Sequence, residues 1–411
     1  MNAIAERIPR RLTAHDIAIA GIVLGAFAFF VALPPISARG VAWPILAGFL
    51  AVAAGVWAIN RDVRRAGWGA VAAGLLGIAM GLLATNASAS NLEEVVVWST
   101  LLGSTLAWAT PLTYAAIGGL ICERSGVVNI GLEGMMLAGA FFGVLGSDKF
   151  GSWWMGLFCA VIAGIGFALV HAVMSIHLRA DQIVSGTAIN FLALGVTGYF
   201  FIQVYGSDGS PGDISRIPNI DDNTRLIGPV IGWLDNIPVI GDFLFKVFGQ
   251  LNLMIWVSFL LLIVAHIFLF KTPFGLRIRS VGEHPRAADT VGIPVYGVRY
   301  FAVLLSGALA AAGGAYLSIG FLSGFTENMT NGRGFIALAA VIFGNWRPFG
   351  AFGAALLFGG STALSFRLAQ VWESQAVLFQ ALPYVLTLVA VAGVIGRSVP
   401  PAAAGRPYVK Q

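Results

Sequence analysis

The chain contains few charged residues. Asp, Glu, Lys and Arg make up 10% of its 411 residues, whereas 58% are hydrophobic. Soluble domains carry roughly 25% charged residues. The mean hydropathy of +0.84 agrees with this excess of apolar side chains. Because so little charge cannot cover an ordinary solvent-exposed surface, the sequence excludes an ordinary soluble globular protein and indicates one embedded in a membrane.

Residues with catalytic and metal-binding side chains are also scarce. The chain has 2 Cys and 5 His. Cys122 and Cys159 show no metal-ligand spacing, so we interpret both as apolar packing residues. The histidines are scattered, and no acid cluster or nucleophile with its base appears, which argues against an integral-membrane enzyme. No Gly-Lys dipeptide occurs, which excludes a Walker A phosphate loop. We therefore expect no cofactor, metal or nucleotide site.

Long apolar segments dominate what is present. Several reach the roughly 20 residues that a helix needs to cross a bilayer of about 30 Å. Residues 251–270 are apolar on every face, which favours helices over the alternating pattern of membrane strands. We predict an all-α, polytopic helical membrane protein with roughly ten to twelve spans. The predicted spans are 16–33, 41–59, 67–84, 99–121, 129–145, 153–176, 183–205, 251–270, 298–320 and a block at 334–396 interrupted by Asn345-Trp346-Arg347-Pro348.

The distribution of cations predicts the orientation. With a cytoplasmic N-terminus, sixteen Lys and Arg residues fall in inside segments and six in outside segments, with Arg347 and Arg367 unassigned. Positive residues concentrate on the cytoplasmic side. We therefore predict a cytoplasmic N-terminus, a cytoplasmic loop at 271–299 and an outer loop at 206–250. This topology accounts for the net charge of +5, so we expect no nucleic-acid partner.

The two long loops differ in character. The outer loop is rich in Gly, Pro, Asp and Asn, and loops of this length are usually functional or disordered. We interpret it as a docking surface or a lid, with a solvated connection as the alternative. In the inner loop, residues 283–292 predict a short helix: Pro285 suits its first position, Glu283 its positive N-terminal end, and Gly292 the position past its end. So short a helix is marginal in water and needs a partner surface.

Three segments resemble one known family. They are 123–140, which contains Glu123-Arg-Ser-Gly-Val-Val-Asn-Ile-Gly-Leu-Glu-Gly134, together with 282–293 and 334–344. They resemble permease subunits of ABC importers, in the branched-chain amino acid, ribose and nucleoside permease family, and most of all its nucleoside and simple-sugar branch. The resemblance divides the chain into an N-terminal extension with about three spans at 1–97, an ABC permease domain at 98–397, and a cytoplasmic tail at 398–411.

The resemblance implies a function and partners. The chain is expected to carry nucleosides, or alternatively ribose-type sugars, across a bacterial inner membrane as a multi-pass permease. An ATPase subunit would hydrolyse ATP, an extracytoplasmic binding protein would deliver substrate, and a second related permease or a second copy would complete the pore. An ion-coupled secondary transporter is the rival class, but it would place several acids or histidines in mid-span. Here the spans offer mainly Glu133, His171 and His266.

The resemblance also assigns a role to the short inner helix. In similar permeases a cytoplasmic helix fits a groove on the ATPase and transmits its closure. Two small residues would make the close contact, three charged residues would form polar pairs, and a glycine would end the helix. These residues are Ala287 and Ala288, then Glu283, Arg286 and Asp289, then Gly292. The alternative is an ordinary solvated loop helix.

Polar and aromatic residues at membrane depth suggest a substrate pathway. Glu133 is costly to bury, and Asn129 lies one helical turn before it; capping and gate packing are the alternative. Asn190, with Thr187 in the same span, offers uncharged hydrogen-bonding groups that suit a polar ligand, although interhelical hydrogen bonds would use them equally well. Trp108 would stack on a base, with packing as the alternative.

A faint internal repeat accompanies these residues. Residues 130–143 laid over 331–344 match at five of fourteen positions, two of them Gly. Glycine-interrupted segments at corresponding places in two halves of a chain point to a transport pathway at the repeat interface. Chance similarity of composition is the alternative.

Overall fold

The structure is a computed structural model that describes residues 13–33, 42–86, 96–206, 209–220, 241–393 and 398–410. The chain forms two compact units. Unit 1 consists of residues 1–98 and 361–397, and unit 2 of residues 99–360 and 398–411.

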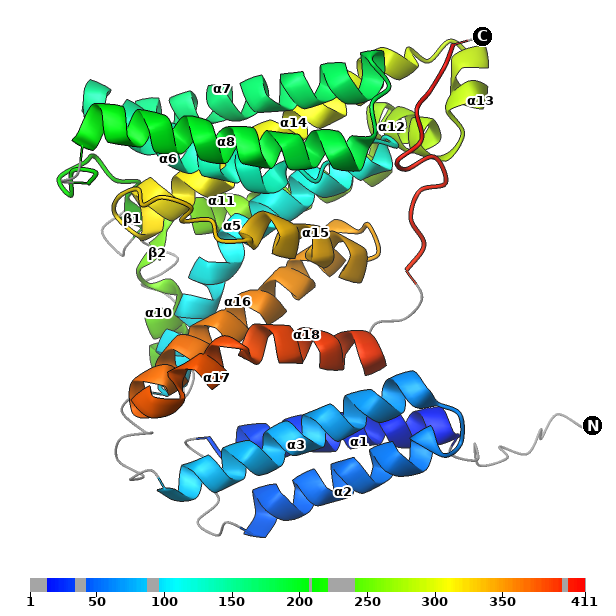
Figure 1. Ribbon diagram of the computed structural model, residues 1–411, viewed down its shortest axis with the longest axis vertical. Coiled ribbons are helices and arrows are strands. Elements are labelled where there is room, and N and C mark those ends of the chain that lie inside the picture. The colour runs from blue at the N-terminus through cyan, green and yellow to red at the C-terminus, as the bar shows by residue number, and fades with distance from the viewer. Residues whose placement is uncertain are drawn as a thin grey trace, which may run out of the picture. The chain divides into compact units, whose positions relative to one another are not determined.

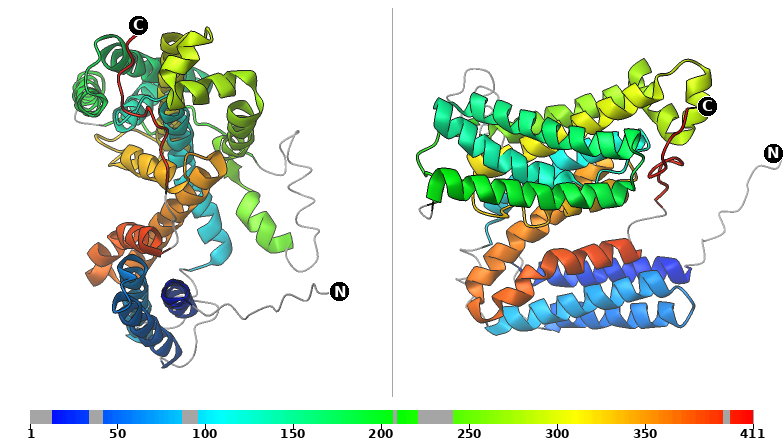
Figure 2. Two further views of the ribbon diagram at one scale, coloured as in Figure 1. Left: turned by 90° about the vertical axis from the view of Figure 1, so that its right-hand side faces the viewer. Right: turned by 45° about the horizontal axis from the view of Figure 1, so that its top comes forward.

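Unit 1 is a helical bundle. Its N-terminal helices α1 (Ala14–Val31), α2 (Ala42–Ile59) and α3 (Arg64–Asn86) contact one another pairwise. The helix α18 (Leu382–Gly393) packs on α1 and α3, so the two ends of the unit's sequence lie side by side (Figure 2). The rest of unit 1 is the C-terminal part of α16 (Pro348–Val371), followed by η4 (Glu373–Gln375) and α17 (Ala376–Gln380).

Small residues bring the helices of unit 1 together. A Cβ atom at Gly25 would lie 2.5 Å from the carbonyl carbon of Ala73, and one at Gly74 would lie 2.6 Å from the Gly48 oxygen. Only glycine allows such approaches of one backbone to another, as is common between membrane helices. At the start of α1, Thr13 and Asp16 form a reciprocal capping box that satisfies exposed backbone N–H groups.

Unit 2 contains the remaining elements (Figure 1). Most are helices, and two short strands pair antiparallel, with Asn219 opposite Asn252 and Ile220 opposite Leu251. In chain order they are α5 (Trp98–Arg124), α6 (Leu132–Phe150), α7 (Trp153–Ala172), η1 (Val173–His177), α8 (Gln182–Tyr205), β1 (Asn219–Ile220), α10 (Gly241–Phe248), β2 (Leu251–Asn252), α11 (Leu253–Lys271), α12 (Pro273–Glu283), α13 (Pro285–Thr290), α14 (Val295–Ala315), η3 (Tyr316–Phe321), α15 (Arg333–Phe343) and α16.

Two helices form the centre of unit 2. The apolar stretches of α5 and of α14 with η3 are 83% and 78% buried, whereas those of α7 with η1 and of α8 are 28% and 17% buried. The exposed sides of α7 and α8 carry large apolar residues such as Phe158, Phe191 and Ile202. Apolar side chains facing outward suit lipid contact. The polar groups of α5 and α14 are therefore the ones that the rest of the unit shields.

Glycines allow α6, α7 and α14 to pack with their backbones in contact. A Cβ at Gly139 of α6 would lie 2.2 Å from the Ala311 oxygen of α14, and one at Gly314 would lie 1.9 Å from the Met136 oxygen. On α7, a Cβ at Gly164 would lie 2.4 Å from the Gly307 oxygen. These distances leave no room for any side chain. The three helices are thus locked at a fixed separation.

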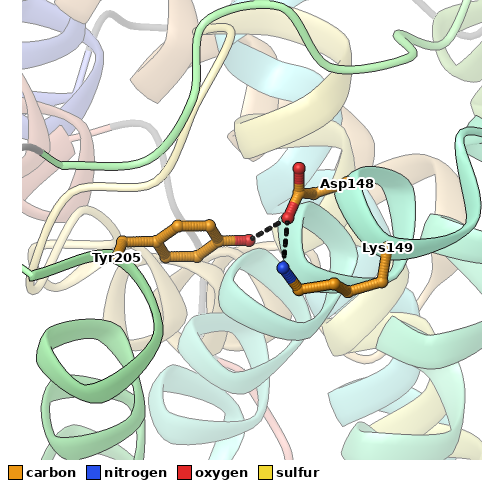
Figure 3. A network of polar contacts seen from close by, with 3 residues as sticks. All are labelled: Asp148, Lys149 and Tyr205. Atoms are coloured by element: carbon orange, nitrogen blue, oxygen red, sulfur yellow. Dashed lines mark hydrogen bonds and ion pairs between the residues drawn. The ribbon is translucent and has the colours of Figure 1, made fainter.

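Polar contacts tie α6 to α8 at the end of unit 2 that carries the strands. Asp148 of α6 accepts a hydrogen bond from the Tyr205 hydroxyl of α8 at 3.3 Å and lies 3.2 Å from the Lys149 ammonium (Figure 3). The segment before β1 is held beside them, because Ser147 donates to the Ser215 carbonyl at 2.5 Å. These contacts fasten the connection that follows α8.

The predicted fold class is confirmed. Among the described residues, eight helices are long and apolar enough to cross a membrane, and two shorter apolar helices accompany them. The interruption at residues 345–348 is real, because α15 ends before it and α16 begins at Pro348. Part of the outer loop predicted at 206–250, namely residues 207–208 and 221–240, lies outside the described residues.

Candidate substrate pathway and coupling helix

The signature segment begins at the end of α5 with two charged residues that fix the position of Trp346. At the end of α5, the buried Glu123 carboxylate accepts a hydrogen bond from the Trp346 indole at 2.5 Å. Arg124 donates to the Trp346 carbonyl from Nε at 3.1 Å and from Nη2 at 2.9 Å. Charge-assisted hydrogen bonds are stronger than neutral ones. The adjacent charges of the signature therefore hold the turn between α15 and α16.

Asn129 lies in the loop between α5 and α6 and is fully buried. Its Nδ2 donates to the hydroxyl of Ser306 on α14 at 2.5 Å and approaches the sulfur of Met135 at 3.4 Å. Its Oδ1 has no hydrogen-bond partner. A buried acceptor without a partner is costly. Among the predicted pathway residues, Asn129 is therefore the one that retains a buried, unused polar atom.

Glu133 caps a helix far away in the sequence. Its Oε1 accepts a hydrogen bond from the Gly332 amide at 2.8 Å, and its Oε2 accepts one from the Gly334 amide at 2.5 Å. These amides belong to the N-terminal turn of α15, where a carboxylate satisfies unpaired N–H groups and opposes the helix dipole. Both carboxylate oxygens are thus engaged within the protein. Glu133 therefore caps a helix start, as in the alternative given with its predicted pathway role, but the helix is α15 and not its own.

Asn190 and Thr187 of α8 have different surroundings. Asn190 Oδ1 accepts from the Gly134 amide at 2.8 Å, and its Nδ2 donates to the Ile130 carbonyl at 3.1 Å. It therefore caps the start of α6, where Gly131 has no side chain to do so. Thr187 donates to the Ile183 carbonyl of its own helix at 2.9 Å. The structure thus joins Asn190 to the signature segment by direct hydrogen bonds, whereas the bond described for Thr187 stays within α8.

Trp108 of α5 lies in an aromatic group. Its ring meets that of Phe321 edge to face, with centroids 4.9 Å apart, and the Arg333 guanidinium lies 4.9 Å from the Trp108 ring centroid. Phe321 in turn stacks on Tyr316 at 6.1 Å, nearly parallel. Trp108 is therefore packed among other side chains, and one of them, Arg333, lies between the two glycines whose amides Glu133 binds.

Beside this aromatic group is a cavity that the sequence analysis missed. It has a volume of about 360 Å³, within the usual range of small-molecule sites. Hydroxyl, amide and ammonium groups line it together with aromatic rings, and the polar and aromatic residues of the lining are Thr100, Ser104, Asn219, Lys246, Gln250, Asn252, Tyr316 and Phe321.

The cavity is assembled from separate parts of the chain. Its lining comes from α5, α10, both strands and η3. The segment Tyr316–Phe321 is π-helical, a geometry often found at functional sites. Because a π-helix depends on hydrogen-bond spacing and not on composition, no pattern in the sequence indicated it.

The predicted inner helix is present as α13. Pro285 occupies its first turn, and Gly292 follows its end with a φ of +83°, a value that favours glycine. Glu283 is the last residue of α12 and directly precedes His284, the N-cap of α13. Its carboxylate accepts a hydrogen bond from the Ala402 amide at 3.2 Å. The two helices form one elbow, with His284 between them.

The two alanines of α13 lie on different faces of the helix. Ala288 is only 3% exposed and belongs to the apolar core of unit 2. Ala287 and Arg286 are exposed, as is Val291 at 76%. Asp289 lies 4.0 Å from the Lys410 ammonium. A partner of this helix would therefore meet the side that carries Ala287 and Val291.

These features define a helical membrane protein whose buried polar residues link segments far apart in the sequence. Residues 101–391 match the family described as the permease component of the branched-chain amino acid transport system, and the chain belongs to this family. The family predicted from the signature, inner-helix and 334–344 segments is thereby confirmed, and the protein is a multi-pass membrane permease.

Several ABC transporter permeases are similar to this chain. The guanosine ABC transporter permease protein NupQ of Bacillus subtilis is 44% identical over 78% of this chain and 99% of its own length. The nucleoside ABC transporter permease protein NupC of Lactococcus lactis is 40% identical over 75% and 96%. A putative glucose ABC transporter permease protein of Haloferax volcanii is 37% identical over 65% and 77%. No solved structure matches the chain.

Proposed function

We propose that this chain is the permease subunit of an ATP-driven importer of nucleosides. The observation that carries the proposal is the cavity of about 360 Å³ beside Phe321. The chain that forms it is similar to a guanosine permease over almost the whole length of that permease. A nucleoside offers a flat aromatic base and a ring of hydroxyl groups. The cavity presents an aromatic ring on which the base would stack, and hydroxyl and amide side chains to which the hydroxyl groups would bind.

The groups in the cavity suit a neutral polar solute. Ser104, Gln250 and Asn219 offer hydrogen bonds without charge. Stacking of a base on an aromatic side chain such as Phe321 contributes roughly 1–3 kcal/mol. Among the described residues that line the cavity, Lys246 is the one cation and none is acidic. These properties favour a solute that is uncharged or carries acceptor groups.

A simple sugar is the second candidate substrate. The similarity to a putative glucose permease supports it, and a sugar would use the same hydroxyl and amide groups. It would gain less from the aromatic ring of Phe321. Nucleoside uptake should therefore be more sensitive than sugar uptake to loss of that ring.

The rest of the pathway is proposed from the residues at the signature. Asn129 and Trp108 are its best-supported members, because Asn129 has an unused buried acceptor and Trp108 packs against a residue of the cavity lining. Glu133 and Asn190 would act as positioning residues, since their hydrogen bonds hold the ends of α15 and α6. Thr187 has the weakest support, because its hydrogen bond is to its own helix.

The same proposal includes the partners. An ATPase subunit would bind α13 through Ala287 and Val291, with Arg286 and Asp289 beside them, and would hydrolyse the ATP. A substrate-binding protein would dock at the end of unit 2 that carries β1 and β2. A second permease, related or identical, would complete the transporter. We place the chain in a bacterial inner membrane with its N-terminus and α13 in the cytoplasm, because the cations concentrate on that side.

Uptake of labelled guanosine into proteoliposomes tests the function. The vesicles would hold this chain, its related permease, the ATPase and the binding protein. We expect ATP-dependent uptake that unlabelled nucleosides compete for and ribose does not. Phe321→Ala and the cavity-filling Ser104→Leu should lower uptake, whereas Phe191→Ala, an aromatic residue 70% exposed on α8, should not. Uptake that does not need ATP would overturn the proposal.

A further inference from the structure

The C-terminal segment 398–410 is docked on the elbow formed by α12 and α13 (Figure 1). The Ala403 amide donates to the Gly282 carbonyl at 2.9 Å, and the Gly405 amide donates to the Gly126 carbonyl at 3.2 Å. A third bond, from the Val399 amide to Asn345 Oδ1, is 3.2 Å long. The segment thus joins α12, the signature turn and the turn before α16 by its own backbone.

Side chains hold the end of this segment equally firmly. Tyr408 is 5% exposed, packs against Tyr296 with ring centroids 5.5 Å apart, and lies 6.0 Å from the Arg299 guanidinium. The Nη1 of Arg299 donates to the Arg406 carbonyl at 3.2 Å. Burial, followed by the contact with Asp289, raises the pKa of Tyr408 above its usual value. Tyr408 is therefore a neutral anchor, and the segment is part of the folded unit.

Between this segment and α13 there is a groove of about 520 Å³. One wall consists of Glu283, His284 and the start of α13, and the other of residues 402–409. The side chains of Arg286 and Arg406 reach the groove from opposite walls and are exposed. The carboxylate of Glu283, the acid of the lining, already accepts a hydrogen bond from the Ala402 amide. The groove is therefore cationic.

We propose that residues 402–409 form the second wall of the ATPase-docking surface, and that the groove binds an acidic segment of the ATPase between Arg286 and Arg406. The inference rests on the proposed function, because it assigns the partner of α13 to an ATPase. Two guanidinium groups facing one groove suit carboxylates, which they bind with paired N–H donors. The exposed Ala287 and Val409 give the groove an apolar edge on each wall.

The backbone and the side chain of Arg406 have different roles, so the binding of an acidic segment can be tested separately from the docking of residues 402–409. Its backbone carbonyl accepts the hydrogen bond from Arg299, whereas its side chain is exposed in the groove. Replacing the side chain therefore leaves the docking of the segment intact. Removing residues 398–411 would instead uncover Arg299, so truncation would confuse docking with folding.

Photo-cross-linking in the assembled transporter tests the surface. A benzoyl-phenylalanine replaces Ala287, Val409 or, as control, Phe150, which is exposed at the far end of α6. We expect cross-links to the ATPase from positions 287 and 409 and none from 150. Cross-links from 287 alone would overturn the second wall and leave the proposed function standing. Cross-links to the ATPase from neither position would overturn both the second wall and the proposed function. Cross-links from position 409 to lipid alone would overturn the second wall.

Charge variants test whether the ATPase segment that binds the groove is acidic. Arg406→Glu should weaken ATPase binding about three- to tenfold, as expected for replacing an attraction between exposed charges by a repulsion. Arg406→Gln should weaken it less and flatten its dependence on potassium chloride. Lys149→Gln, which removes an exposed cation at the other end of α6, should change neither. If Arg406→Glu leaves the affinity for the ATPase and its salt dependence unchanged, the proposal that an acidic segment binds the groove is overturned.

Discussion

The carboxylate of Glu133 accepts a hydrogen bond from the amide of Gly334, a residue 201 positions later in the chain. The two residues are equivalent when residues 130–143 are laid over 331–344. They also touch through their backbones, since a Cβ at Gly334 would lie 2.4 Å from the Glu133 Cα. The starts of α6 and α15 are therefore joined at the same position of the two aligned segments.

Glu133→Gln should destabilise the protein by about 1.5–3 kcal/mol, the usual value of a hydrogen bond to a charged group. A glutamine keeps one acceptor oxygen, so its NH2 group would face one of the two amides of α15. Thermal unfolding of the purified protein in detergent measures the loss. Glu327→Gln, which alters an exposed carboxylate, is the control. Equal unfolding temperatures for both variants would contradict the capping role.

Gly334→Ala should lower the folded yield and stability, because the added methyl group would collide with the backbone of Glu133. Gly353→Ala is the matched change, since Gly353 is exposed in α16 and a Cβ there meets nothing within 4 Å. It should be neutral or stabilising by up to about 1 kcal/mol through helix propensity. Only Gly334→Ala should lower the unfolding temperature; an unfolding temperature of Gly334→Ala no lower than that of Gly353→Ala would argue against the close approach.

Trp346→Phe should destabilise the protein more than Trp256→Phe, by roughly 2–3 kcal/mol, because it leaves the buried Glu123 carboxylate without its donor. The Nε1 of Trp256 is buried and has no partner. Both changes remove similar volume, so the difference isolates the hydrogen bond. Unfolding in detergent, followed by circular dichroism, compares them. A larger loss in Trp256→Phe would rule out the role of Glu123 in holding the turn before α16.

Asn129→Ala should lower guanosine uptake per folded transporter about tenfold, as expected if the substrate uses one hydrogen bond worth roughly 1.4 kcal/mol. Ser306→Ala should spare uptake, because it removes only the partner of Asn129 Nδ2. A double-mutant cycle in unfolding should give a coupling of about 1 kcal/mol between the two residues. Equal uptake in both single variants would mean that Asn129 is purely structural.

Val291→Glu should abolish stimulation of the ATPase while leaving the fold intact, because Val291 is 76% exposed at the end of α13. Ala288→Glu should reduce folded protein, because it forces a charge into the core, where Ala288 is 3% exposed. Size-exclusion chromatography reports folding, and co-purification with the ATPase reports docking. Normal co-purification of Val291→Glu would exclude this face of α13 as the docking surface.

Local signals predicted much of this protein correctly. The positions of Pro285 and Gly292 predicted α13 because proline and glycine act through their own backbone angles. That α12 continues up to Glu283 was not predicted, because the end of that helix depends on how the elbow packs. The burial of Ala288 was not predicted either. Composition does not distinguish Ala287 from Ala288, and only packing against unit 2 decides which of them is buried.

The sequence by itself determined the membrane class, the approximate spans and the family, because hydrophobic length, charge distribution and signature residues are properties of short segments. The tertiary structure decided which polar groups remain available. It paired Glu133 with α15 and Asn190 with α6, left Asn129 Oδ1 without a partner, and assembled the cavity beside Phe321 from α5, α10 and η3. Such pairings join residues up to about two hundred positions apart. They depend on the packing of whole helices, which no local pattern encodes.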